Sequence, residues 1–174
     1  MVNRKKTMIN KIVTKFPKLE GLKNIGGHKI YHLEGNALIH TAMVCENAIN
    51  DEEWFFNVCA LHDIGKLYTS VCHGENDWTY PNHSVSGALH LSEFVDEEDY
   101  FYLVYKWFIE NHIKPLFWKD LEDSKNLTTV PAGYEEYCSV KNIIKLAIYD
   151  VNGSISSIEN PKKEELTQFY ELLK

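Results

Sequence analysis

The stretch His62-Asp63-Ile64-Gly65-Lys66 places an imidazole and a carboxylate side by side in the chain. Neighbouring His and Asp side chains can give one nitrogen and one oxygen to the same divalent cation, and such a mixed ligand set suits Mn, Fe, Co, Ni, Zn or Mg. His40 lies upstream of this stretch and Asp150 lies far downstream. We therefore expect one tight metal site formed by His40, His62, Asp63 and Asp150.

The expected ligands share faces with a hydrophobic core. Apolar residues recur at helical spacing in four segments, and each segment carries a His or an Asp on its apolar side. A buried carboxylate without a partner costs on the order of several kcal/mol, so Asp150 requires a cation or strong donors beside it. A lysine partner, or a role in capping a neighbouring helix, is the alternative for Asp150. The four segments are 36–49, 52–63, 97–112 and 134–151.

Helical patterns cover most of the chain, and no convincing sheet is present in the sequence. With 174 residues, the chain has the length of one domain with a proper core. We predict an all-α fold, a single helical bundle over residues 1–174, in which Asn36 caps a helix and Gly65 and Gly153 serve as turn residues. Further helices are predicted at 9–16, 84–94 and 162–173; residues 21–35, 69–82 and 115–131 are predicted loops, with a short extended piece at 78–80.

Charge is distributed unevenly along the chain. Residues 1–30 hold eight basic and one acidic residue, whereas the remainder holds 10 basic and 24 acidic residues and brings the net charge to −7. We expect the basic N-terminal segment, 1–30, to form a solvated or amphipathic helix that docks on its own acidic domain. The charge leaves open a contact between this segment and an anionic partner such as RNA.

The composition also bears on location. No apolar run approaches the roughly 18 residues that a membrane span needs, and the N-terminus has no apolar signal core. The four cysteines form no C-x-x-C pair. We therefore expect a cytoplasmic protein that does not contact the membrane and has reduced, buried thiols. The cysteines are Cys45, Cys59, Cys72 and Cys138.

The order His…His-Asp…Asp, with Gly-Lys directly behind the doublet, resembles the HD superfamily of metal-dependent phosphohydrolases. The closest motif likeness is to the HD domain of bacterial tRNA nucleotidyltransferases, in which an aromatic-His-x-Glu-Gly-Asp segment precedes the first ligand. Here Tyr31-His32-Leu33-Glu34-Gly35-Asn36 stands in that place, with Asn for the usual Asp. The blocks His83-x-x-x-Gly87-Ala88 and Asn111-His112 match the later motifs of that domain, so that the likeness spans about 31–151.

The resemblance implies an HD-domain bundle that hydrolyses phosphoesters. The catalytic head of the nucleotidyltransferases has no counterpart in this chain, so adenylate addition to tRNA is not expected. In HD proteins with a second metal, histidines after the doublet join the bridging Asp; here His83 and His112 either take that role or bind a substrate phosphate. We expect one tight metal site and a weaker second site. The remaining histidines, which are expected to be structural or exposed, are His28, His32, His73 and His90.

The expected chemistry follows from the ion. A bound divalent metal lowers the pKa of its water toward about 7 and polarises a phosphoryl oxygen. Asp63 orients the water, and Lys66 neutralises charge on the phosphate. We predict a metal-dependent phosphohydrolase, a phosphomonoesterase or phosphodiesterase, acting on a nucleotide, cyclic phosphate or related small phosphoester. The alternatives are an HD-fold mixed-valence di-iron oxygenase and a non-catalytic nucleotide sensor. Phe117 and Trp118 either stack on a base or pack as a lid.

Overall fold

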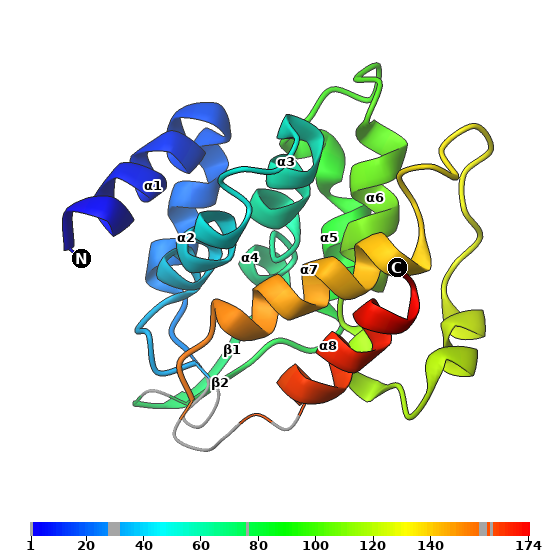
Figure 1. The fold of residues 1–174 in the computed structure, drawn as a ribbon. Coiled ribbons are helices and arrows are strands. Elements are labelled where there is room, and N and C mark those ends of the chain that lie inside the picture. Colours follow the sequence, from blue (N-terminus) through cyan, green and yellow to red (C-terminus); the bar gives the residue numbers. More distant parts are fainter. Residues whose placement is uncertain (1, 28–31, 76, 157–159, 161) are drawn as a thin grey trace.

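The structure is a computed structural model, and it describes residues 2–27, 32–75, 77–156, 160 and 162–174. These residues form the predicted all-α bundle, with strands only in one two-stranded antiparallel hairpin (Figure 1). No described helix is both long and apolar enough to cross a membrane. The elements are α1 Val2–Lys15, η1 Pro17–Asn24, α2 Ala37–Asn47, α3 Glu53–Leu61, α4 Lys66–Thr69, β1 Val71–Gly74, β2 Asp77–Thr79, α5 His83–Leu89, η2 Leu91–Glu93, α6 Tyr102–Asn111, η3 Lys114–Phe117, η4 Leu121–Asn126, α7 Val140–Asn152 and α8 Lys162–Leu172, in which η marks a 3₁₀ helix.

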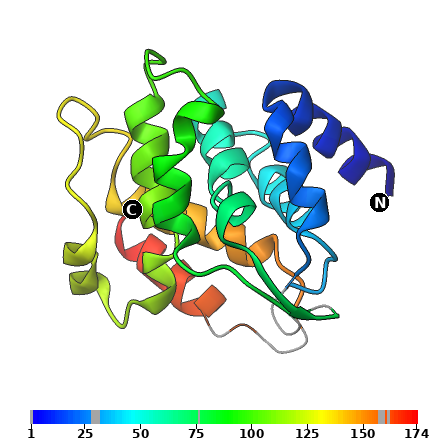
Figure 2. The ribbon, with the colours of Figure 1, turned by 180° about the vertical axis from the view of Figure 1, so that it is seen from behind.

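The helices with predicted ligands pack around one core. In Figure 1, α7 crosses in front of α2 and α3, and it contacts both helices. Seen from behind, α5 lies beside α6 (Figure 2), and α6 in turn contacts α3. The core between these helices contains fully buried side chains from α2, α3, α6 and α7, among them Val44, Val58, Phe108, Ile109 and Ile143. The ligand helices are therefore held by a continuous apolar interior.

The basic N-terminal segment docks on the bundle as an amphipathic helix, as predicted. The helix α1 begins earlier than the predicted residue 9, and Met8, Ile12 and Phe16 form its buried stripe. Its neighbour in space is α2. Lys15 forms an ion pair with Glu53, which links the basic segment to the acidic body. Residues 17–24, partly predicted to be irregular, form the 3₁₀ helix η1, because its apolar side chains are buried.

Local hydrogen bonds decide where several helices begin. The predicted N-cap is confirmed, since the Asn36 side chain accepts a hydrogen bond from the Ile39 amide at 3.0 Å. Ser139 caps α7 in the same way, so this helix begins at Val140 and not at residue 134. The helix α6 begins five residues later than predicted, because the Asp99 side chain accepts a hydrogen bond from the Phe101 amide and forms a turn. Similarly, α5 ends at Leu89, and the 3₁₀ helix η2 follows.

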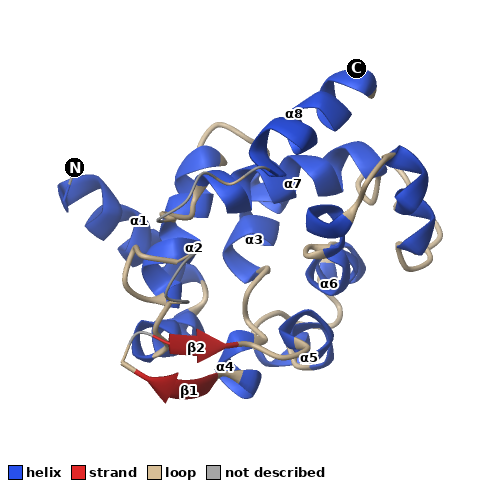
Figure 3. Cartoon of the chain, turned by 90° about the horizontal axis from the view of Figure 1, so that it is seen from below, coloured by secondary structure: helices blue, strands red, loops and turns tan. Residues whose placement is uncertain are grey.

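The predicted loops contain regular structure. The segment 69–82 holds the hairpin of β1 and β2, which lies beside α4 at one end of the bundle (Figure 3). The segment 115–131 contains η3 and η4. In it, Trp118 is 1% exposed whereas Phe117 is 75% exposed. Trp118 is therefore a packing residue, and only Phe117 is available to a ligand. The C-terminal helix α8 lies against α7, with Leu166 fully buried.

Gly65 and Gly153 lie in turns, as predicted, but Gly153 does not adopt the expected left-handed conformation, and both glycines permit close packing. Gly65 has a φ of −63°, which any residue can adopt, but a Cβ at this position would lie 1.8 Å from the carbonyl oxygen of His83 and 2.6 Å from the Gly87 nitrogen. Gly153 has a φ of −78°, not the left-handed conformation, and its Cβ would lie 2.6 Å from Val44. Gly65 therefore permits the close approach of α4 and α5.

Candidate metal centre

The four predicted ligands of the first site meet in space, although they come from α2, the turn after α3, and α7. The Nε2 atom of His40 lies 2.9 Å from Asp150 Oδ1 and 3.6 Å from Asp63 Oδ2. The Nε2 atom of His62 lies 3.3 Å from Asp63 Oδ2 and 3.9 Å from Asp150 Oδ1. We call these four residues the first half-site. The ligand atoms of His40, His62 and Asp63 lie close enough together to hold one cation, and Asp150 Oδ1 lies beside both histidines.

The first half-site is buried, and the Nε2 atoms that face its centre lack well-aligned partners in the described part of the chain. His40, His62 and Asp63 are each at most 2% exposed, and the Asp150 side chain is 15% exposed. Within the described residues, the Nε2 atoms of His40 and His62 form no well-aligned hydrogen bond. Buried polar atoms are normally paired, because leaving one unpaired costs on the order of 1–3 kcal/mol. The cluster of His40, His62 and Asp63 can hold a metal ion, which would provide the missing partner.

Backbone carbonyls fix the tautomer of three histidines. A carbonyl oxygen can only accept a hydrogen bond, so an Nδ1 atom next to it must carry the proton and Nε2 must present a lone pair. This is the protonation state that a metal-binding imidazole needs. The pairs are His62 Nδ1 with Cys59 O at 2.8 Å, His83 Nδ1 with Tyr80 O at 2.9 Å, and His112 Nδ1 with Ile109 O at 2.7 Å.

A carboxylate takes the place of the carbonyl at His40. The Oε1 atom of Glu34 lies 3.1 Å from His40 Nδ1 and 2.8 Å from His32 Nδ1, and Oε2 accepts a hydrogen bond from the Ile155 amide at 2.9 Å. The Glu34 side chain is only 1% exposed. No role was predicted for Glu34, and His32 was expected to be structural or exposed. Both residues were missed because they lie outside any helical pattern; only their place in the HD-like entry segment pointed to them.

The charges of the first half-site favour a cation. Burial alone would lower the pKa of His40, but the carboxylates of Asp150 and Glu34 outweigh burial and raise this pKa to about 9. Burial alone would raise the pKa of Asp63, but Lys66 and His62 hold it well below its usual range. The metal-free cluster therefore keeps its carboxylates ionised and a proton on His40, which a divalent cation would displace.

Lys66 is part of the centre. Its side chain is 5% exposed, and Nζ lies 2.6 Å from Asp63 Oδ2 and 4.5 Å from the centre of the Tyr80 ring. Lys66 is therefore not an ordinary exposed lysine. An ammonium group at this position can balance negative charge beside Asp63.

His83 and His112 approach the other oxygen of Asp63. Asp63 Oδ1 lies 3.4 Å from His83 Nε2 and 3.7 Å from His112 Nε2, and the two Nε2 atoms are 3.1 Å apart. We call these three residues the second half-site; they form another group that can hold a metal ion. Burial lowers the pKa of His83 to about 4, so its ring is neutral near pH 7. With both Nδ1 atoms protonated, two Nε2 lone pairs would repel unless a proton or a cation lies between them.

The other predicted residues lie apart from this centre. His73 belongs to the hairpin and pairs with Thr79, and the His90 ring stacks on Tyr68. His28 lies outside the described residues. Cys45, Cys59 and Cys138 are buried free thiols as expected, but Cys72 is exposed on β1, and the prediction that it is buried is wrong.

Neither protein-family models nor curated proteins match this chain. Its class therefore rests on the fold and the site: an all-α protein in which a buried cluster of His and Asp side chains can hold a metal ion.

Proposed function

We propose that this protein is a metal-dependent phosphohydrolase of the HD type, acting on a nucleotide, a cyclic phosphate or a related small phosphoester. The observation that carries the proposal is the position of Asp63, whose two carboxylate oxygens face two separate pairs of inward-pointing imidazoles. A carboxylate between two such sets is suited to bridging two metal ions, as two-metal hydrolases require.

The two half-sites would bind with different strength. The first offers four ligands, His40, His62, Asp63 and Asp150, whereas the second offers Asp63 with two histidines. We infer a tight ion in the first half-site and a weaker ion in the second. The mixture of imidazole and carboxylate ligands suits Mn, Fe, Co, Ni or Zn. Magnesium prefers carboxylate oxygens, which are the minority of the ligands here.

A bound divalent ion would lower the pKa of its water and polarise the phosphoryl oxygen. The protein would position the reacting groups around that chemistry. Asp63 would orient the attacking water through a carboxylate oxygen, and Lys66 would turn from Asp63 to the phosphate as negative charge develops there. Hydrolysis would form a bond between the water oxygen and phosphorus and break the ester P–O bond, releasing the alcohol. The partial exposure of Asp150 and His83 marks the side from which substrate would enter.

The same two-ion geometry favours one other function. A mixed-valence di-iron oxygenase would also use an Asp bridge with two histidines on each side. The two proposals differ in the metal that supports turnover and in the consumption of oxygen. A non-catalytic nucleotide sensor would bind nucleotide without turnover, and an RNA contact of the basic N-terminal segment stays a prediction.

The deciding experiment combines elemental analysis with a screen of phosphoester substrates under added Mn, Co, Ni or Mg. We expect bound metal and a hydrolytic activity that disappears with a chelator and returns with metal. His73→Ala, at an exposed position on the hairpin, is the matched control for substitutions of the ligand histidines. Oxygen uptake by the iron-loaded protein without phosphate release would replace the hydrolase proposal with the oxygenase.

A further inference from the structure

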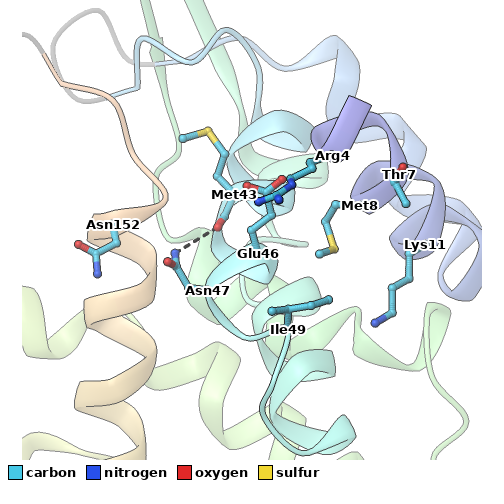
Figure 4. Close-up of a pocket in the computed structure, with 9 residues that line it drawn as sticks. All are labelled: Arg4, Thr7, Met8, Lys11, Met43, Glu46, Asn47, Ile49 and Asn152. Atoms are coloured by element: carbon cyan, nitrogen blue, oxygen red, sulfur yellow. Dashed lines mark hydrogen bonds between the residues drawn. The ribbon is translucent and has the colours of Figure 1, made fainter. Parts of the chain in front are cut away.

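A cavity lies away from the metal centre, between α1 and α2 (Figure 4). Its volume is about 680 Å³, which falls within the range of about 300–1,000 Å³ that is typical of small-molecule pockets. None of the metal-centre residues lines it. In Figure 4, one wall carries side chains of α1, the facing wall carries side chains of α2, and Asn152 at the end of α7 closes one side.

The wall from α1 is cationic. Arg4 and Lys11 are exposed side chains that both line the cavity, and they lie seven residues apart, about two helical turns or roughly 10 Å. Lys11 is held in place by Phe56, because its Nζ atom lies 4.1 Å from the centre of that ring. Two cations along one wall favour an anionic ligand, and a phosphate group would match the fixed donors of Arg4.

The wall from α2 carries a hydrogen-bond acceptor that no donor in the described structure contacts. The Oε1 atom of Glu46 is buried and has no hydrogen-bond partner within the described residues, although Glu46 lines the cavity. An ionised carboxylate can only accept hydrogen bonds, so this atom requires an N–H or O–H group. A ligand that carries an N–H donor as well as an anionic group would satisfy both walls.

Two methionines, Met8 of α1 and Met43 of α2, are among the residues that line the cavity (Figure 4). A thioether is polarizable and flexible, and it forms favourable contacts with the edge of an aromatic ring. A flat aromatic ring would therefore fit between α1 and α2, with its polar edge toward Glu46.

We propose that this cavity is a binding site for a purine nucleoside monophosphate. The phosphate would lie against Arg4 and Lys11, the base between Met8 and Met43, and the N–H groups on the edge of the base against Glu46. GMP is the best probe, because guanine presents two neighbouring N–H donors to one carboxylate. This site does not depend on the metal centre.

The methionines also provide the test. The chain has only three, Met1, Met8 and Met43, so the methyl spectrum of protein labelled with ¹³C-methyl methionine contains few signals. The full-length protein is titrated with GMP in the presence of EDTA, which keeps the metal centre out of the measurement. We expect saturable shifts of the Met8 and Met43 signals, assigned through Met8→Leu and Met43→Leu. Guanosine and inorganic phosphate, each lacking one recognised part, should bind at least about tenfold more weakly.

Two substitutions and one control sharpen the test. Arg4→Ala removes a cation, and Glu46→Gln keeps the size of the side chain but replaces an acceptor oxygen with a donor; each should weaken GMP binding about tenfold or more. Lys6→Ala removes the same charge from an exposed position of α1 that does not line the cavity, and it should leave binding unchanged. Thermal unfolding checks that all three proteins fold.

Three results would overturn the proposal. The Met8 and Met43 signals could stay in place up to millimolar GMP, inorganic phosphate alone could bind as tightly as GMP, or GMP could bind Arg4→Ala and Glu46→Gln as tightly as the wild type. Because EDTA is present throughout, these results are independent of whether the metal-dependent hydrolase exists.

Discussion

The two sides of Asp63 are built differently. On one side, His40 and His62 approach Oδ2, Asp150 lies beside His40, and both imidazoles are at most 2% exposed. On the other side, only His83 and His112 approach Oδ1, and the His83 side chain is 14% exposed. The first half-site offers four ligands, the number of a permanent metal site, whereas the second offers three. If the proposed function holds, the first half-site retains its ion and the second exchanges its ion with solvent or substrate.

The largest effect is expected from Asp63→Ala, which removes the residue common to both half-sites. Metal content should fall at both, and hydrolysis should fall by at least about a thousandfold. In addition, the buried Lys66 would lose its carboxylate partner, which costs about 3–5 kcal/mol of stability. Elemental analysis, a phosphoester assay and thermal unfolding measure the three effects. Hydrolysis at the wild-type rate by the purified variant would refute the assignment.

The next largest effect is expected from His83→Ala, which changes only the second half-site. If His83 binds an ion, His83→Ala should lower metal content from two equivalents to one and reduce the rate steeply, while the first ion stays bound. If His83 binds only the substrate phosphate, metal content should not change, and only transition-state binding should weaken. His90→Ala, on the residue that ends the same helix, is the matched control and should leave both quantities unchanged.

A smaller effect is expected from Glu34→Gln. The substitution keeps the shape of the side chain but removes the negative charge beside His40 Nδ1. Loss of such a carboxylate behind a metal-bound histidine typically weakens metal affinity about 10–100-fold. The loss should be confined to the first half-site, so competition with a chelator should show one weakened ion and one unchanged ion. Equal weakening at both half-sites would contradict the role of Glu34.

The smallest effect is that of a change of one pH unit on the affinity for the first ion. The pKa of His40 in the metal-free protein is raised to about 9, so metal binding must displace a proton below this pH. Apparent affinity should therefore decrease by up to about tenfold for each pH unit below 9. Calorimetry in two buffers of different ionisation enthalpy would detect the released proton, and no release at pH 7 would contradict the expectation.

The raised pKa of His40 also makes the stability of the metal-free protein depend on pH. Because the pKa of His40 is higher in the folded chain than its ordinary value of 6.5, protonation stabilises the folded state. In the metal-free protein this contribution is fully present below about pH 6.5 and is lost as pH rises through about 9. Denaturant unfolding of chelator-treated protein at several pH values measures it.

The sequence predicted which side chains meet in the first half-site better than it predicted the structure around them. His40 and Asp150 could be placed because each lies on the apolar side of a helix, and His62 because it directly follows such a helix, where periodicity determines direction. Glu34 and His32 could not, since the segment before α2 has no periodicity and its path depends on distant contacts such as the bond to Ile155. The HD-like motif included both residues but did not predict their contacts.

Helix boundaries were missed for a related reason. The helices α6 and α7 begin late because Asp99 and Ser139 bond to nearby amides, and a helical pattern of apolar residues does not detect such short-range competition. Lys66 shows that a local sequence pattern does not predict the burial of a single side chain. The sequence placed it close behind the ligand helix, but its burial depends on packing against Tyr80, which no local pattern reveals.

The backbone contact between Gly65 and α5 has a consequence for how related sequences can diverge. A methyl group at position 65 would collide with the His83 carbonyl and the Gly87 nitrogen, so α5 would have to move, and His83 with it. The first half-site has no ligand on α5 and would be spared. In homologues, we therefore expect the glycine at position 65 and the histidine at position 83 to be lost together. If both half-sites bind an ion, proteins that bind only one would arise first through a shift of α5. The ligands of the first half-site would stay unchanged.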